Sequence, residues 1–162
     1  NISNPDITIS GKGVWDSIDV LYNSKKINIK SCAFFSNLVL LEAKDWSSEG
    51  EYLPNLKTEF AKYDYFILVR IKDDIKASFR KKTPIKNKAD LVNEIRNKVE
   101  KTHFYYDIPG YFTTVTLKHI IDKKYVLPKN ALLNGKTKVD ADNYYIQSGD
   151  LRNTSLLINE LK

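Results

Sequence analysis

Residues 15–31 read WDSIDVLYNSKKINIKS and predict the first structural unit of the chain. Apolar and polar residues alternate on both sides of Asn23 and Ser24, which is typical of two short strands joined by a tight turn. Asn readily adopts positive φ, so we expect a two-residue turn at these positions. In that register Asp19 lies directly opposite Asn28, with Cβ atoms roughly 5 Å apart. A slip of one residue would exchange the two faces of the hairpin, so the apolar pattern itself favours this register.

The predicted hairpin has one polar and one apolar face. Lys30 lies on the same face as Asn28, because side chains two positions apart on a strand point to the same side. Four aliphatic residues form the other face, which we expect to lie against the core: Ile18, Val20, Ile27 and Ile29. From spacing alone, a solvated hairpin surface is the simplest interpretation of the polar face. A metal site is the alternative.

The polar face carries the residue types that phosphodiester hydrolysis needs. The carboxylate of Asp19 and the amide oxygen of Asn28 are ligands of the kind that Mg²⁺ takes in proteins. Lys30 beside the metal could orient or deprotonate the attacking water, or stabilise the pentavalent phosphate. A second pair, Glu42 and Lys44, ends the next predicted strand and shares one of its faces. Glu42 is therefore a second candidate for a metal-binding carboxylate.

The composition is that of a single globular domain. The chain has 162 residues, of which 42% are hydrophobic, and a net charge of +6 that suits an anionic partner such as nucleic acid. The single cysteine, Cys32, excludes an internal disulfide framework and a multi-cysteine zinc site. No apolar run has membrane-spanning length and no signal peptide is visible, so we expect a cytoplasmic protein with no membrane partner. The chain begins at Asn1 and contains no Met, so we expect a further segment upstream.

The remaining chain predicts a mixture of strands and helices. Strands are expected at residues 1–13 (around Ile7 and Ile9), 37–46, 63–71 and 144–147, and the strand at 63–71 is apolar enough to be buried on both faces. An aromatic and β-branched segment at 104–115 contains a predicted turn at Pro109-Gly110. Helices are expected from Asn87 to near His103, at 117–124 with Thr116 as the N-cap, and at 150–162.

Several common catalytic signatures are missing from the sequence. There is no glycine-rich phosphate loop, no HExxH zinc motif and no GxSxG nucleophile motif. The two histidines, His103 and His119, are isolated, which is more typical of structural residues than of a catalytic pair. The most densely charged stretch is 72–88, which contains seven basic and two acidic residues. Pro84 favours a loop there.

One family resemblance follows from these residues. Asp19, then eight residues, then Asn28-Ile29-Lys30-Ser31, followed by the strands NLVLLEAKDW and YDYFILVRI, resembles the core of the PD-(D/E)XK nuclease superfamily, in particular type II restriction endonuclease-like proteins. The resemblance covers roughly the first 70 residues. It implies an α/β (α+β) fold with a restriction-endonuclease-like mixed sheet flanked by helices. It also implies Mg²⁺-dependent cleavage of double-stranded DNA.

The resemblance assigns roles to individual residues. Asp19 would be a metal ligand and Lys30 the catalytic lysine. Asn28 would occupy the second acidic position of the family, which is a departure, because an amide oxygen binds a metal more weakly than a carboxylate and brings no charge. Either Asn28 is a weak ligand, or Glu42 supplies the missing carboxylate, or the site has lost activity.

The implied organisation is one nuclease-like domain over residues 1–162, with a core at 5–71, a basic loop and helix at 72–103, and a C-terminal segment at 104–162 that could contact DNA. A homodimer is expected, because one such site cuts one strand and a two-fold protein matches a symmetric DNA site. Candidate DNA-binding residues are basic or amide side chains: Lys76, Arg80, Lys81, Lys82, Lys86, Lys136, Lys138 and Asn143. The alternatives are a catalytically degenerate nucleic-acid-binding module with the same fold, and a structural subunit in which the polar hairpin face is merely solvated.

Overall fold

The computed structural model of this protein describes residues 18–57, 61–72 and 87–162. The strand expected at 1–13 and residues 73–86 of the expected basic loop lie outside the described residues. Within the described ranges, no helix is both long enough and apolar enough to cross a membrane.

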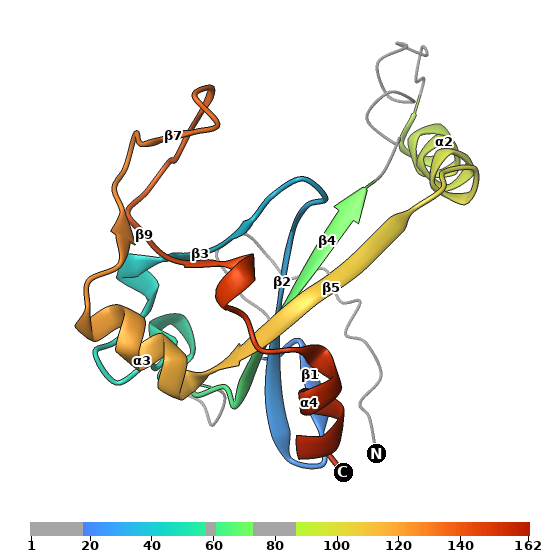
Figure 1. Ribbon diagram of the computed structural model, residues 1–162. Coiled ribbons are helices and arrows are strands. Elements are labelled where there is room, and N and C mark those ends of the chain that lie inside the picture. The colour runs from blue at the N-terminus through green and yellow to red at the C-terminus, as the bar shows by residue number, and fades with distance from the viewer. Residues whose placement is uncertain (1–17, 58–60, 73–86) are drawn as a thin grey trace.

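A four-stranded mixed sheet runs through the molecule (Figure 1). Its strand order is β1-β2-β4-β5, where the strands are β1 (Val20–Tyr22), β2 (Lys25–Ala33), β4 (Tyr65–Lys72) and β5 (Tyr105–Thr113). β2 and β4 are parallel, whereas β1 with β2 and β4 with β5 are antiparallel. The α+β class with a mixed sheet, expected from the sequence, is confirmed.

The opening hairpin has the predicted turn and register. Asn23 and Ser24 have φ values of 46° and 62°, and positive φ at both central residues defines the turn that matches the twist of a two-residue hairpin. Val20 pairs with Ile27, and Tyr22 with Lys25. Local turn chemistry therefore determines which residues of β1 and β2 face each other.

The larger core lies between this sheet and a second layer. That layer contains a three-stranded sheet, in the order β3-β9-β6, and helix α3 (Thr114–Asp122). The strands are β3 (Leu38–Glu42), β6 (Val126–Leu127) and β9 (Asn143–Gln147). Phe66 and Phe112 stack at 4.6 Å between ring centroids, and Trp46 packs edge-on against Phe66 at 5.5 Å.

A smaller core covers the opposite face of the main sheet. Tyr65 and Ile27 pack there with Tyr111 and with Leu157 of helix α4 (Thr154–Glu160). Because Phe66 and Leu68 point into the larger core, β4 is buried on both faces, as its apolar run predicts.

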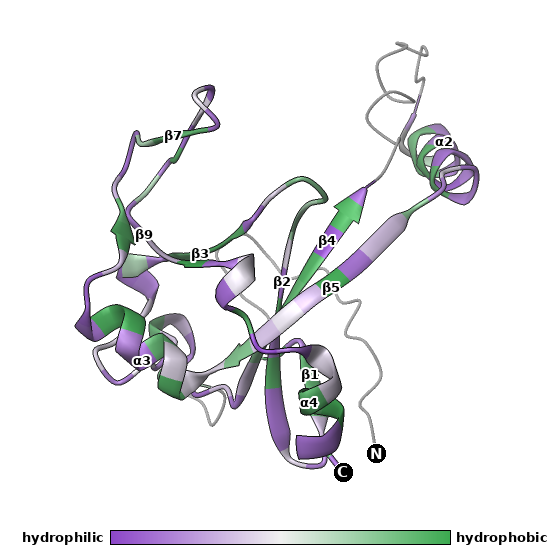
Figure 2. Ribbon diagram, in the orientation of Figure 1, coloured by the Kyte–Doolittle hydropathy of each residue, from purple (hydrophilic) through white to green (hydrophobic). Residues whose placement is uncertain are grey.

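Helix α2 (Lys88–Glu100) lies at the far end of β4 and β5, away from α3 and α4 (Figure 1). Its predicted N-cap is confirmed, since the Asn87 side chain accepts a hydrogen bond from the backbone amide of Asp90 at 2.9 Å. The helix ends at Glu100, short of His103. Apolar and hydrophilic residues alternate along it in Figure 2, and Leu91, Ile95 and Val99 each remain 38–41% exposed.

Three predictions, two of element boundaries and one of a turn, were wrong. The strand expected to reach residue 46 ends at Glu42, and a 3₁₀ turn, η1 (Ala43–Asp45), follows it. The turn expected at Pro109-Gly110 is instead a bulge inside β5, where the pairing shifts between Leu68 and Arg70, and a bulge tolerates the missing amide of a proline. Helix α3 begins at Thr114 with Thr113 at its N-cap, ahead of the expected cap at Thr116.

The shorter elements complete the chain. Two 3₁₀ turns, η2 (Leu53–Asn55) and η3 (Ser148–Asp150), flank the larger core. A small hairpin of β7 (Leu132–Leu133) and β8 (Thr137–Lys138) projects from the second layer beyond β9 (Figure 1). The strand and helix expected near the C-terminus appear as β9 and α4.

Candidate functional site

The middle of β2 places Asn28 on the side of the larger core. Only 6% of Asn28 is exposed, so the expectation that it lies on a solvated face was wrong. The reason is non-local: the aromatic ring of Tyr63 packs over this part of the sheet, and the Asn28 amide hydrogen-bonds the Tyr63 hydroxyl. Among the described residues, the Asn28 Oδ1 atom has no hydrogen-bond partner.

Asp19 lies just before β1 and is held against β2. The backbone amide of Ile29 donates a 2.7 Å hydrogen bond to Asp19 Oδ2. The sequence-based expectation that Asp19 sits beside residues 28–30 of the neighbouring strand is therefore supported by a direct contact. Asp19 itself is exposed, so its carboxylate borders solvent while Asn28 lies beneath the surface.

Lys30 shares the Asn28 side of β2 and is half-buried. Burial lowers the pKa of the Lys30 amine from its usual 10.5, and the charges of Asp19 and Asp45 oppose this shift. A lowered pKa increases the fraction of neutral amine that can accept a proton. Asp19 and Lys30, which the sequence predicts to act together, thus lie within electrostatic reach of each other.

Asp45 is a site residue that sequence reasoning missed. It ends the 3₁₀ turn η1, which follows β3 directly. Burial raises the pKa of the Asp45 carboxyl, as does the neighbouring charge of Glu42, whereas Lys44 and Lys30 oppose the shift. The alternation of residues 38–44 predicts a continuing strand, so no local pattern signalled the 3₁₀ turn that ends at Asp45.

Glu42 lies nearby but is already paired. Lys44 Nζ contacts Glu42 Oε1 at 2.7 Å, and the side chains of Glu42 and Lys44 are 37% and 72% exposed. Glu42 and Lys44 thus do lie together, at the junction of β3 and η1, but the lysine forms an ion pair with Glu42 at the surface. The charge of Glu42 contributes to raising the pKa of Asp45 and the pKa of Tyr52.

Two tyrosines border the carboxylates and were also missed. Burial, followed by the charge of Asp45, raises the pKa of Tyr52 to about 12. Burial likewise raises the pKa of Tyr63, while hydrogen bonds from Asn28 and Asn55 oppose that shift. Both hydroxyls therefore stay protonated at neutral pH, and Tyr52 lies against Trp46 at 5.1 Å between ring centroids.

The site is rich in oxygen but poor in carboxylates. Among the described residues, no three His, Cys, Asp or Glu side chains come together as a metal-binding group. Asp19 is placed beside Asn28 by its contact with the Ile29 amide, whereas Asp45 acts on the charge of Lys30 and is not shifted by Asp19. The unpartnered Oδ1 atom of Asn28 supplies a neutral oxygen. A divalent cation bound here would thus depend on the amide and on water for its remaining ligands.

The candidate DNA-binding residues are scattered. Lys76, Arg80, Lys81, Lys82 and Lys86 lie outside the described residues. Lys136 and Lys138 are exposed on the projecting β7–β8 hairpin. Asn143 is only 7% exposed and its side chain donates to the backbone oxygen of Ala141 at 2.8 Å, so its observed contact is a structural one within the chain.

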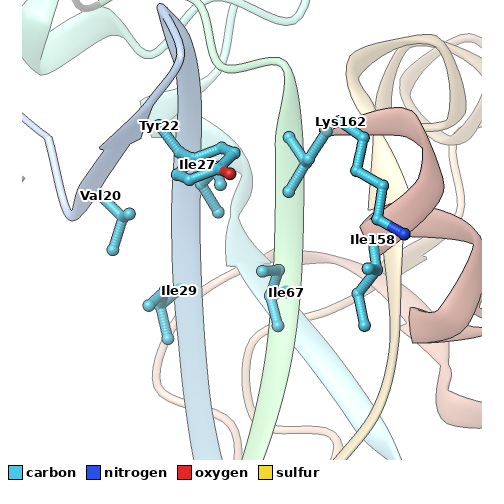
Figure 3. A pocket seen from close by; sticks show the side chains of 8 residues that line it. Val20, Tyr22, Ile27, Ile29, Ile67, Ile158 and Lys162 are labelled. Atoms are coloured by element: carbon cyan, nitrogen blue, oxygen red, sulfur yellow. The ribbon is translucent and has the colours of Figure 1, made fainter. Parts of the chain in front are cut away.

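The other face of the hairpin lines an apolar groove of about 380 Å³ (Figure 3). Val20, Ile27 and Ile29 line it from β1 and β2, Ile67 from β4, and Ile158 and Leu161 from the C-terminal segment. This apolar face was predicted, but its burial is incomplete, since Ile29 is 39% exposed. Ile18 was expected to share this face, but it packs against the larger core.

No family model, curated protein or solved structure matches this chain. The chemistry of the site is therefore judged from its own residues.

Proposed function

We propose that this protein is a Mg²⁺-dependent endonuclease with a restriction-endonuclease-like fold, which hydrolyses phosphodiester bonds of double-stranded DNA. The observation that carries the proposal is the arrangement of Asp19, Asn28 and Lys30 around one side of β2. Asp19 contacts the β2 backbone, Lys30 lies within reach of its charge, and Asn28 has a buried oxygen without a partner.

The buried oxygen of Asn28 fits a cation ligand. A buried polar atom without a partner costs free energy, so its retention needs a compensating role. Its neighbours on this side of β2 are the acid Asp19 and the amine Lys30. Asp19 and Asn28 would hold the ion, which when bound supplies positive charge to the phosphate and lowers the pKa of water.

The chain itself supplies the proton transfer and part of the charge. Lys30 in its neutral form accepts the proton of the water that attacks phosphorus, and the lowered pKa of its amine increases that population. The water oxygen bonds to phosphorus as one ester P–O bond breaks. Tyr52 and Tyr63 stay protonated, so neither adds negative charge to a site that must accept a phosphate.

Binding to DNA would use cations away from this centre. The exposed Lys136 and Lys138 lie on a projecting hairpin, and the basic stretch 72–88 follows β4 along the chain. Contacts to phosphates give affinity that falls as salt rises. A homodimer would place two such sites on the two strands of a symmetric duplex.

The test compares full-length wild type with two site variants on supercoiled and linear DNA, each with Mg²⁺ or Mn²⁺. Asp19→Asn keeps the hydrogen-bond acceptor for Ile29 but removes the charge, and Lys30→Gln removes the amine. Lys123→Gln, on the exposed C-terminal end of α3, is the matched control. We expect metal-dependent cutting to fall at least about 100-fold in both site variants and to persist in the control.

The second candidate is a nucleic-acid-binding module that keeps this fold without catalysis. The amide at position 28, where the resembling family carries an acid, favours it. Its signature is wild-type protein that binds duplex DNA in a salt-dependent way but cuts with neither metal. That result would overturn the nuclease proposal.

A further inference from the structure

We propose that a second pocket, between α3 and β9, binds a guanine base. The pocket has a volume of about 250 Å³. Its lining residues come from α3, from β9 and from the segments that follow each of them, and none belongs to the site on β2. The inference therefore does not depend on the proposed metal-dependent cleavage.

Helix α3 supplies one side of the pocket through a single helical face. Thr116, His119 and Ile120 are three and four positions apart, so their side chains lie on one side of the helix. Ile120 is only 4% exposed, and Ile146 of β9 is buried beside it. Thr116 and His119 are more exposed. The pocket thus has an apolar floor with polar atoms at its mouth.

The end of α3 positions Tyr125 at the pocket. The backbone amide of Tyr125 donates to the Ile120 carbonyl at 3.1 Å. The amide of Lys124, which has a φ of 54°, donates to the Ile121 carbonyl at 3.0 Å. This pair of hydrogen bonds is the Schellman motif, which folds the chain back onto the last helical turn. The Tyr125 carbonyl in turn accepts from the Tyr145 amide of β9 at 3.1 Å, so the backbone of Tyr125 is held from both sides.

Three rings form an aromatic wall. The His119 ring meets the Tyr125 ring at 84°, with 6.2 Å between centroids. The Tyr125 ring lies 6.3 Å from the Tyr145 ring at an angle of 33°. Tyr125 nevertheless remains 45% exposed. An exposed ring on a fixed backbone is a stacking surface for a flat ligand, and unpaired bases bind to aromatic side chains in this way.

The polar side chains at the mouth are not used within the protein. Gln147 lies two positions after Tyr145 on β9, so both side chains point to the same side, and Asp150 follows in η3. Across residues 18–57, 61–72 and 87–162, the side chains of Thr116, Gln147 and Asp150 form no hydrogen bond or ion pair. A hydroxyl, an amide and a carboxylate are therefore available to a ligand.

The two oxygens of Asp150 select guanine among the bases. A carboxylate accepts two hydrogen bonds from adjacent donors. Guanine carries such donors side by side, at N1 and at the N2 amino group. The amino groups of adenine and cytosine lie next to a ring nitrogen that is an acceptor, and the single N–H of uracil or thymine lies between two carbonyls. Gln147 adds an amide donor for guanine O6.

The size of the pocket fits one base rather than a whole nucleotide. Its volume of about 250 Å³ is just below the roughly 300–1,000 Å³ of pockets that bury a drug-sized ligand. The sugar and phosphate therefore stay outside. The amine of Lys124, directly before Tyr125, is exposed and forms no ion pair within 4 Å in the described part of the chain. This charge suits a nucleotide better than a neutral sugar ring.

The test measures binding by isothermal titration calorimetry, with the full-length protein in EDTA so that metal-dependent cleavage plays no part. The ligands are GMP, AMP, CMP and UMP, and two short oligothymidylate strands, one of which carries a single central guanine. Tyr125→Leu removes the stacking ring, Tyr125→Phe keeps it, and Asp150→Asn removes one acceptor. Tyr106→Leu and Asp140→Asn, at exposed positions outside the pocket, are the matched controls.

We expect wild type to bind GMP at least about fivefold more tightly than the other three nucleotides. Tyr125→Leu should weaken GMP binding at least about fivefold, because base stacking is lost, while Tyr125→Phe and both controls stay within about twofold of wild type. Asp150→Asn should weaken GMP binding by at least about fivefold and remove the preference for guanine. If Tyr125→Leu is poorly folded, the exposed Asp150→Asn variant decides the test.

The two kinds of ligand distinguish the sources of the base. Tight binding of GMP would identify a free guanine nucleotide, whereas binding of the guanine-bearing strand alone would identify an unpaired base of a nucleic acid. Either result supports the guanine site if the Tyr125→Leu and Asp150→Asn variants weaken it. Equal binding of all ligands, no saturable binding, or binding that these variants leave unchanged would overturn the inference. Because EDTA removes the metal, none of these outcomes decides the nuclease proposal.

Discussion

The backbone amide of Ile29 donates a 2.7 Å hydrogen bond to the carboxylate of Asp19. This contact ties the residue that precedes β1 to the middle of β2, beyond the last backbone pair of the hairpin, Val20 with Ile27. Asp19 therefore extends the hairpin with a side chain where the strand itself has ended. Any substitution of Asp19 changes a structural acceptor as well as a charge, and the two effects can be separated.

We expect Asp19→Ala to lower the free energy of unfolding by about 1 kcal/mol, because the Ile29 amide loses its acceptor. Asp19→Asn keeps an oxygen at the same place and should stay within about 0.5 kcal/mol of wild type. Urea denaturation of the three proteins in a metal-free buffer provides the comparison. Equal losses in Ala and Asn would show that the charge, and not the hydrogen bond, stabilises the hairpin.

Asn28 is a position where stability and function should conflict. Replacing it by Leu removes a buried oxygen that has no partner, and Tyr63 keeps its hydrogen bond with Asn55. We expect Asn28→Leu to unfold within about 1 kcal/mol of wild type, or to be more stable, and yet to lose cation binding. Chemical denaturation measures the free energy of unfolding. Displacement of the luminescent ion Tb³⁺ by Mg²⁺ measures cation binding. If Asn28→Leu lost several kcal/mol in the free energy of unfolding, the Asn28 amide would be a structural group.

Asn28→Asp tests the same oxygen from the opposite direction. The new carboxylate would be buried beside Tyr63 and close to Asp19, so without metal we expect a loss of about 1–3 kcal/mol in the free energy of unfolding. Mg²⁺ should recover more stability in this variant than in wild type, because a charged ligand binds it more tightly. Thermal unfolding with and without MgCl₂ measures the difference. An equal Mg²⁺ effect in both proteins would place Asn28 outside the cation site.

The parts of this structure that were predictable are those that depend on neighbouring residues in the chain. The turn at Asn23-Ser24 and the register of β1 with β2 follow from residue types that tolerate positive φ and from strict alternation. The cap at Asn87 is equally local. For the same reason the apolar run of β4 correctly predicts burial on both faces.

The errors arose where distant segments decide the environment. The solvation of Asn28 depends on Tyr63, which lies 35 positions away and covers the strand. Asp45 was missed because the strand pattern of residues 38–44 gives no sign of the 3₁₀ turn that redirects it. Pro109-Gly110 carries a strong turn signal, but pairing of β5 with β4 overrides it and absorbs the proline in a bulge.

Gly110 is predicted to be essential for the close approach of β5 to the segment before α4. A Cβ atom at Gly110 would lie 2.6 Å from both the Arg152 backbone oxygen and Leu151 Cβ. The backbone bridge of Tyr111 with Arg152 leaves no room for either to move away. We expect Gly110→Ala to lower the free energy of unfolding by about 1–3 kcal/mol.

The matched control for this prediction is Gly149→Ala, since a Cβ atom at Gly149 meets nothing within 4 Å. It should stay within about 0.5 kcal/mol of wild type. Guanidinium denaturation of both variants makes the comparison. If the two alanine variants were equally stable, the contact of Gly110 with Leu151 and Arg152 would not be close enough to exclude a methyl group.

The ion pair between Arg70 and Asp107 should make stability depend on acid pH. Arg70 Nε donates to Asp107 Oδ1 at 2.8 Å, and a second contact joins its Nη2 atom to Oδ2 across directly paired positions of β4 and β5. The hydrogen bonds from Arg70 hold the pKa of Asp107 below its usual 3.8. The unfolded chain therefore binds the proton first, so the contribution of this pair is present above pH 3.8 and is lost as pH falls through the folded-state pKa.

We expect Tm to fall less steeply with decreasing pH over that acid range in Asp107→Asn than in wild type. Arg70→Gln should reduce the slope by the same amount, and the double variant should reduce it little further. Thermal unfolding monitored by circular dichroism across the range measures these slopes. Parallel slopes in all four proteins would show that the pair does not couple folding to protonation.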